Sequence, residues 1–381
     1  MDVVVVGGGV IGLAVAWRLS QRGLQVTVVD PDPTGGASHA AAGMLAPVTE
    51  LHYGEETLLA LNLESNRRWP EFAAELESAS GLTCGYRREG TVAVALDAGD
   101  RAVLSELVAY QQSLGLSVEL LTGRQVRALE PMLAPAVCAG TLVAHDRSVD
   151  NRRLRAALLA TCLRSGVQLV REPALAVEVT AGQADGVRLG SGDVVTGDCV
   201  VVAAGVESAS LGGIPAGAVP VRPVKGQILR LRVPDHLRPL PIHTVRATVV
   251  GKPVYLVPRA DGELVIGATS EELGFDTSVT AGAVHRLLRD ARAVVPAVDE
   301  LELVETLARL RPCTPDNAPL IGETAVPGLV AATGHYRNGM LLTPVTADLI
   351  ADLVTGGVTP SIAEPFSPRR FKTAQHQEVP A

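Results

Sequence analysis

The feature that most constrains the fold is a glycine-rich turn that directly follows an apolar strand pattern at the N-terminus. Residues 3–12 read VVVVGGGVIG, so Gly7, Gly9 and Gly12 form a G-x-G-x-x-G motif between a valine run and a helix pattern. A continuous β-branched run is typical of a buried parallel strand. A second apolar run, LQVTVVD, ends in Asp30, eighteen positions after Gly12.

This arrangement predicts a dinucleotide site. Gly7 allows the tight turn, Gly9 lets the backbone approach a pyrophosphate, and Gly12 lets the helix pack on the strand. The helix N-terminus offers unpaired N–H groups to the phosphates, and Asp30 lies near the spacing at which a carboxylate accepts ribose hydroxyls. These residues do not separate FAD from NAD.

Charge and length limit the alternatives. The chain has 381 residues, 47% of them hydrophobic, which suffices for one large or two medium domains. Its net charge of −8 argues against a nucleic-acid partner. No uncharged stretch reaches the roughly 20 residues of a membrane span, and the N-terminal apolar run is broken by glycines, so we expect neither a membrane anchor nor a signal peptide.

The five cysteines form neither a C-x-x-C motif nor a pair with a nearby histidine. We therefore expect no metal site and no disulfide framework, and reduced thiols in a cytoplasmic protein. They are Cys84, Cys138, Cys162, Cys199 and Cys313.

Periodicity predicts alternating helices and strands. Helices are expected over 10–22, 55–79 (interrupted at Pro70), 98–114, 123–130, 150–165, 280–294 and 339–355. Strands are expected over 91–96, 167–170, 174–179, 186–189, 199–205, 226–233, 244–250, 253–258, 263–268, 301–309, 318–322 and 328–333. The buried runs lie at both ends and in the middle, with antiparallel patterns between them. This order predicts an α/β fold (α+β, two domains) in which a Rossmann-like domain is interwoven with an antiparallel-sheet domain.

Four segments carry residues suited to binding and catalysis. The small-residue loop 36–47 can lie against a flat ring, and its Ser38 can bond a phosphate. The glycine-rich turn 334–339 precedes a helix expected to begin near Met340, whose positive end would stabilise charge on a reduced flavin. Arg311 and Tyr255 can bind a carboxylate. Each segment alone also fits an ordinary loop or a solvated side chain.

Taken in this order, the segments resemble the D-amino-acid oxidase and glycine oxidase family of FAD enzymes. The quoted motifs are SHAAAGMLAP, VYLVPR, LRPCTPDNAPLIG and GHYRNGMLLTP, and the resemblance extends from Val3 to about Phe371. The likeness is greatest to the glycine oxidases of thiamine biosynthesis. It implies a discontinuous FAD-binding domain (1–83, 146–220 and 310–372), a substrate-binding domain (84–145 and 221–309) and a flexible tail (373–381).

The resemblance also implies roles for individual residues. Arg311 and Tyr255 would bind the substrate carboxylate, with Arg337 at the rim of the pocket. Val177 would touch the adenine through its backbone. The remaining cofactor-binding residues would be Gly7, Gly9, Val10, Ile11, Gly12, Asp30, Ser38, Ala41, Ala42, Gly43, Met44, Ala204, Gly205, Gly334, His335, Tyr336, Arg337, Asn338, Gly339, Met340 and Leu341.

Two positions depart from the family pattern. Asp30 stands where glutamate is usual, and a shorter acid should still reach the ribose. Cys313 stands in a turn that often holds glycine. Because this is not the position used by covalently flavinylated sarcosine oxidases, we expect noncovalent FAD.

The activity implied is oxidative deamination of glycine, or of other small amines and D-amino acids, with dioxygen reduced to hydrogen peroxide. Thiazole formation would consume the imine, with thiazole synthase as a partner, and the enzyme would be a homotetramer. Alternatives are a sarcosine or proline oxidase, a D-amino-acid dehydrogenase, an NAD-dependent dehydrogenase and a non-catalytic flavin-binding subunit.

Overall fold

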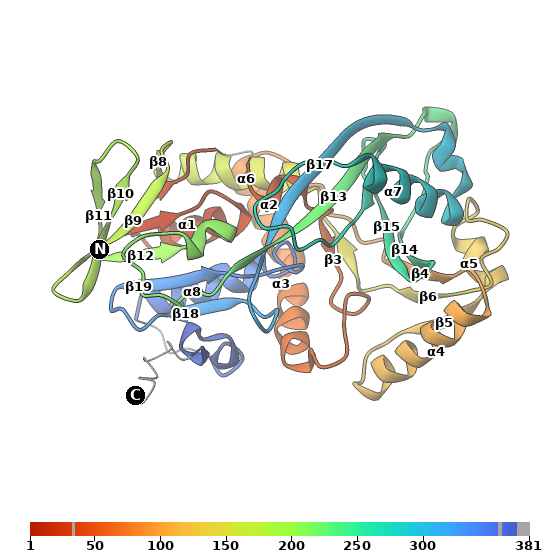
Figure 1. Cartoon of the computed structure of the whole chain (residues 1–381), viewed down its shortest axis with the longest axis horizontal. Helices are drawn as coiled ribbons and strands as arrows, with labels where there is room; N and C mark the ends of the chain where they lie inside the picture. The colour runs from red at the N-terminus through yellow and green to blue at the C-terminus, as the bar shows by residue number, and fades with distance from the viewer. Residues whose placement is uncertain (33–34, 357–359, 372–381) are drawn as a thin grey trace, which may run out of the picture.

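A computed structural model describes residues 1–32, 35–356 and 360–371 of the chain. Two large sheets make up the two halves of the molecule, and two long strands, β13 (Arg222–Arg232) and β17 (Glu302–Cys313), run from one half toward the other (Figure 1). The expected tail, 373–381, lies outside the described residues.

The first half is built on a six-stranded, mostly parallel sheet in the order β18-β19-β12-β1-β2-β8. The valines of β1 are almost wholly buried, because neighbouring strands flank them on both sides and helices cover the sheet. The strands are β1 (Asp2–Val6), β2 (Gln25–Val29), β8 (Gln168–Val170), β12 (Cys199–Val202), β18 (Leu320–Glu323) and β19 (Leu329–Thr333).

Four helices pack into the core of this half. They are α1 (Val10–Gln21), α3 (Glu56–Ser80), α6 (Asn151–Arg164) and α8 (Thr343–Val354). The side chain of Asp150 caps α6 by accepting from the amides of Arg152 and Arg153, as the sequence predicts. A small antiparallel sheet of β9 (Ala174–Thr180), β10 (Gln183–Leu189) and β11 (Val194–Thr196) lies beside the sheet.

The second half is built on an eight-stranded, mostly antiparallel sheet in the order β17-β13-β16-β15-β14-β4-β6-β5. Its further strands are β4 (Thr91–Ala95), β5 (Glu119–Thr122), β6 (Ala139–Val143), β14 (Thr244–Val249), β15 (Lys252–Pro258) and β16 (Glu263–Gly267). The helices on this side are α4 (Ala98–Ser113), α5 (Gly123–Leu129) and α7 (Ala281–Val294). The pairing β3 (Met44–Leu45) with β7 (Arg147–Ser148) adds a two-stranded ladder.

The predicted interruption of α3 at Pro70 is wrong, since the helix runs unbroken from Glu56 to Ser80. Proline cannot donate to the carbonyl four residues earlier. That carbonyl, on Asn66, instead accepts a bond of 3.0 Å from Arg147 Nη1. A side chain from elsewhere in the chain thus satisfies the group that Pro70 leaves open.

The last helix begins at Thr343 rather than near Met340. Hydrogen-bonded turns occupy 339–342, because the Leu341 carbonyl accepts bonds from Ser65 and Trp69 of α3. Pro344 also lacks an amide donor and sits in the first helical turn. The positive end of α8 therefore lies three residues further along the chain than predicted.

Other predicted boundaries also move. Strand β12 ends at Val202 and is followed by a 3-10 helix, Gly205–Ala209, in which Gly205 has a left-handed backbone. Strand β17 continues past 309 to Cys313, because it pairs with β13 along its length. The loop 36–47 contains the one-turn helix α2 (Ala37–Ala40) and β3.

Within the described ranges, no helix combines the length and apolar character needed to cross a bilayer. The same ranges contain no cluster of three metal-ligating side chains.

Candidate active site

A cavity of about 1090 Å³ lies where the two halves meet. Its walls come from β1 and α1, from the loop around α2, from β13, β15 and β17, and from the turn before α8. The predicted residues that line it are Gly7, Gly9, Val10, Ile11, Asp30, Ser38, Ala41, Ala42, Gly43, Met44, Ala204, Gly205, Tyr255, Arg311, His335, Tyr336, Arg337, Gly339 and Met340.

The glycine motif sits at one end of this cavity. A Cβ on Gly7 would lie 2.4 Å from the Ala203 carbonyl oxygen, and its φ of 111° is one that only glycine adopts readily. A Cβ on Gly12 would lie 1.9 Å from the Gly7 oxygen, so Gly12 serves helix packing and does not line the cavity. The site thereby presents the uncapped start of α1, which has no acidic residue in its first turn.

Asp30 directly follows β2 and lines the same cavity. Its carboxylate accepts from the backbone amides of Gly8 and Asp32. Burial raises the pKa of Asp30, and these two amides partly oppose that shift. A fixed carboxylate facing the cavity suits a ribose hydroxyl.

Ser38 connects the α2 loop to the glycine motif. Its hydroxyl lies 3.2 Å from the Val10 amide at the start of α1 and accepts from it. The position of this hydroxyl beside a helix N-terminus suits a phosphate neighbour.

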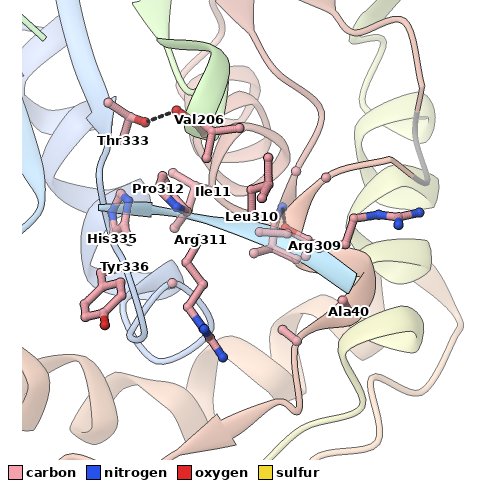
Figure 2. A pocket seen from close by; sticks show the side chains of 18 of the residues that line it. Ile11, Ala40, Val206, Arg309, Leu310, Arg311, Pro312, Thr333, His335 and Tyr336 are labelled. Carbon is pink, nitrogen blue, oxygen red and sulfur yellow. Dashed lines mark hydrogen bonds between the residues drawn. The ribbon is translucent and has the colours of Figure 1, made fainter. Parts of the chain in front are cut away.

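Arg311 and Tyr255 lie together at the opposite end. A nearby Arg311 guanidinium lowers the pKa of the Tyr255 phenol, but burial raises it more, so the phenol remains protonated and able to donate. Arg311 Nη1 donates to the Thr269 carbonyl at 3.0 Å. Within the described ranges, Arg311 forms no ion pair. Figure 2 shows Arg309 and Arg311 leaving β17 toward different parts of the cavity.

Two glycines that the sequence analysis did not single out make room for this pair. A Cβ on Gly226 of β13 would lie 2.5 Å from Arg311 Nη2. A Cβ on Gly267 of β16 would lie 2.4 Å from the Tyr255 hydroxyl, directly across the strand pair. The shape of the polar end therefore depends on glycine at both positions.

Arg337 lines the cavity but is already paired. Its Nη2 lies 2.9 and 2.8 Å from the two oxygens of Glu55. Burial alone would lower the pKa of Arg337, yet the Glu55 and Glu50 carboxylates raise it. Arg337 would have to leave Glu55, or share it, to touch a substrate.

His335 is a buried, neutral side chain. Its Nε2 lies 3.0 Å from Thr346 Oγ1, and burial lowers its pKa to about 3. It lines the cavity without acting as a base near neutral pH.

Five predicted cofactor residues do not reach the cavity: Gly12, Val177, Gly334, Asn338 and Leu341. The Val177 amide donates to the Gly212 carbonyl at 2.9 Å, and the Val177 side chain lies in an apolar cluster. Pro173, Ala174 and Leu175 line the cavity instead, because they stand at the start of β9. The contact of Val177 with the adenine stays a prediction.

Gly334, Asn338 and Leu341 lie in the turn before α8 but outside the cavity lining. A Cβ on Gly334 would lie 2.5 Å from Thr314 Cγ2, and the Leu341 carbonyl bonds α3. The Asn338 carbonyl accepts from the Leu342 amide at 2.8 Å. Cys313 also lies outside the lining, with its thiol 3.0 Å from Asn317 Oδ1.

Sequence reasoning missed an ion pair in the cavity wall. Arg246 Nη1 lies 2.9 Å from Glu50 Oε1, and Arg246 stands opposite Tyr255 in the β14–β15 pair. An arginine inside an otherwise apolar strand pattern, 244–250, was the available signal.

This geometry defines the class of protein. The chain matches the DAO family, described as FAD dependent oxidoreductase, over residues 2–353, and it belongs to that family. FAD is the family's cofactor, and the open glycine turn, the fixed Asp30 carboxylate and the uncapped start of α1 fit its dinucleotide part.

Glycine oxidases and bifunctional ThiO/ThiG proteins are among the proteins similar to this chain. Glycine oxidase of Geobacillus kaustophilus is 34% identical, with 96% of each chain covered. The crystal structure of glycine oxidase from that organism superposes with a TM-score of 0.88 at 33% identity, covering 98% of each chain. The bifunctional protein ThiO/ThiG of Trichormus variabilis is 36% identical over 97% of this chain and 55% of its own length. The chain thus spans about half the length of the first relatives it matches.

Proposed function

We propose that this chain oxidises glycine, and other small amines or D-amino acids, to the imine with dioxygen as the final acceptor. The observation that carries the proposal is the Arg311–Tyr255 pair, whose half-buried side chains lie together in the wall of the family's cofactor cavity. The names of the glycine oxidase relatives support the choice of glycine.

In this proposal Arg311 binds the substrate carboxylate and Tyr255 donates to it. A planar guanidinium can hold a carboxylate through two parallel bonds, so two groups fix both the position and the rotation of a small substrate. The phenol stays protonated because burial raises its pKa. FAD, which the glycine motif, Asp30 and Ser38 would hold, would supply the acceptor for the two electrons lost by the substrate and would pass them to dioxygen, giving hydrogen peroxide.

The cavity wall holds several titratable side chains. Burial lowers the pKa of His52, so its imidazole is uncharged near neutral pH. His335 is neutral and bonded to Thr346, and the carboxylates Glu50 and Glu55 are held by arginines. This fits loss of the Cα hydrogen as hydride from a neutral amine. The imine product would then be released from the site and hydrolysed.

The wider assignments are also proposals. We infer two domains with the boundaries given above, although the boundary at 309/310 falls inside strand β17. The fused names of the ThiO/ThiG relatives support thiazole formation as the step that consumes the imine, and thiazole synthase as the partner that receives it. We also propose that the enzyme is a homotetramer and that it is located in the cytoplasm.

The test is reduction of the purified holoenzyme by glycine without air, followed through the flavin absorbance, and then exposure to air. Bleaching by glycine and recovery with peroxide would support the proposal. Failure of glycine to bleach the flavin would contradict it. Sarcosine, proline and small or bulky D-amino acids as reductants would then identify the substrate, and transfer to a quinone instead of dioxygen would indicate a dehydrogenase.

A further inference from the structure

A buried asparagine stands behind the loop that carries Ser38 to Gly43. Asn151, the first residue of α6, is fully buried. Its Nδ2 donates to the carbonyls of Ser38 and His39 at 2.8 and 2.9 Å. The side chain therefore bridges two consecutive carbonyl groups of the loop.

Two buried arginines fix the same asparagine from the other half of the molecule. Its Oδ1 accepts from Arg230 Nη2 at 2.9 Å and from Arg259 Nη2 at 3.2 Å. Arg230 lies on β13 and pairs with Glu263, and Arg259 follows β15. With both donors and its acceptor engaged, Asn151 has a single orientation.

Arg259 also bonds the loop directly. Its Nη2 donates to the Ala42 carbonyl at 2.6 Å, and its Nη1 donates to the Val149 carbonyl at 2.9 Å. The Val149 amide in turn donates to the Gly43 carbonyl at 2.8 Å. Burial lowers the pKa of Arg259 to about 10, so the guanidinium stays charged near neutral pH.

The result is a loop in which four carbonyls are held by this network. Those of Ser38, His39, Ala42 and Gly43 accept bonds from Asn151, Arg259 or Val149. The amides of Ala42 and Gly43 have no acceptor in the described part of the chain, and both residues line the cofactor cavity. Buried amides without partners are rare unless a ligand takes them.

We propose that Asn151, held by Arg230 and Arg259, is a positioning residue that turns the amides of Ala42 and Gly43 toward bound FAD. It acts on the cofactor through the loop and touches neither substrate nor cofactor. Because Arg230 and Arg259 come from the second half, the same bonds set the loop relative to the sheet that carries Arg311. The inference rests on FAD occupying the main cavity, and not on the identity of the substrate.

The test compares Asn151→Asp with the wild type. Aspartate keeps the size and both arginine contacts, but it presents oxygen instead of N–H to the carbonyls of Ser38 and His39. We expect the dissociation constant of FAD, measured by fluorescence titration of the apoprotein, to rise on the order of tenfold or more. We also expect a change in the visible spectrum of the bound flavin, which a uniform loss of stability would not produce.

The matched control is Asn66→Ala, because Asn66 is also buried and donates one side-chain bond to a backbone carbonyl, that of His145, away from the loop. It should leave the FAD constant and the spectrum unchanged. If Asn151→Asp does not fold, Arg259→Lys provides the second test, since it keeps the charge and loses the forked bonds. An FAD constant within twofold of wild type with an unchanged spectrum, in either folded variant, would overturn the proposal. These measurements do not depend on which substrate reduces the flavin.

Discussion

At the scale of single residues, the polar end of the cavity depends on one guanidinium. Arg311 bonds a backbone carbonyl, whereas Arg246 and Arg337 are paired with Glu50 and Glu55. In the described part of the chain no carboxylate offsets the charge of Arg311, so this charge is available to an incoming carboxylate. This difference could not be read from the sequence, where the three arginines look alike.

Replacing Arg311 by lysine should therefore weaken substrate binding strongly. Lysine keeps the positive charge but loses the forked geometry, and a hydrogen bond to a charged group contributes about 1.5 to 3 kcal/mol, so kcat/KM for glycine should fall by roughly tenfold or more, while FAD remains bound. Steady-state peroxide assays and the flavin absorbance measure the two effects. Arg188→Ala, on the exposed side of β10, is the control. Glycine turnover at the wild-type rate in Arg311→Lys would remove this residue from the site.

His335 gives a pH prediction. Its pKa is about 3 when folded, because burial disfavours the charged ring, against about 6.5 in an unfolded chain. The unfolded state binds more protons in acid, so the stability contributed by neutral His335 is complete above pH 6.5 and is lost as the pH falls toward 3. At pH 5 the loss is about 2 kcal/mol.

Urea unfolding of wild type and His335→Gln at pH 7 and pH 5 checks this prediction. The variant should be less stable at pH 7, and the difference between the two proteins should shrink by about 2 kcal/mol at pH 5. The subtraction removes Asp146, which titrates in the same range because burial raises its pKa to about 6. A constant difference between the two pH values would contradict a neutral His335.

At the scale of elements, the sequence predicted most helices and strands but missed how distant groups alter them. The G-x-G-x-x-G turn, the capped start of α6 and the buried runs are local signals, and the structure confirms the helices and strand that they predict. The unbroken α3 and the late start of α8 depend on Arg147, Ser65 and Trp69, which are remote in the sequence. No local pattern carries that information.

The bond from Arg147 to α3 can be tested by a double-mutant cycle with Pro70. Arg147→Ala leaves the Asn66 carbonyl without its donor, whereas Pro70→Ala restores a backbone amide able to reach it. Arg147→Ala should therefore cost less in the Pro70→Ala background, with a coupling energy of about 1 kcal/mol. Arg164, which donates to the Ala79 carbonyl at 3.0 Å, is the control and should show no coupling to Pro70.

The strand pair β13–β17 makes a second element-scale prediction. A methyl group at position 226 would lie 2.5 Å from Arg311 Nη2, so Gly226→Ala must displace the guanidinium. A displacement of about 1 Å can cost on the order of a hundredfold in rate. We expect kcat/KM for glycine to fall at least tenfold with little change in FAD affinity. Gly282→Ala, in α7 with nothing within 4 Å, is the matched control and should keep the wild-type rate.

At the scale of the whole molecule, the cavity joins two sheets that each have their own apolar core. The sequence predicted this interwoven arrangement from the order of its patterns. It did not predict that Pro173, Ala174 and Leu175 line the cavity, because the edge of the cavity is set by where β9 starts in space. Of the residues that tie the halves, Arg230 comes from a segment without any motif, and Arg259 ends the VYLVPR motif but was given no role there.

A ligand that fills this cavity should stabilise both halves together. At a free concentration a hundred times its dissociation constant, FAD adds about 2.7 kcal/mol to the free energy of unfolding, provided that the unfolded chain does not bind it. Calorimetry should therefore show one transition for the holoenzyme, with a Tm that rises with FAD and falls when FAD is removed. Riboflavin lacks the diphosphate and adenosine, which we propose contact the start of α1 and Asp30, so it should raise Tm less at equal concentration. Two separate transitions in the holoenzyme, with only one responding to FAD, would mean that the cofactor stabilises a single sheet and that the halves unfold independently.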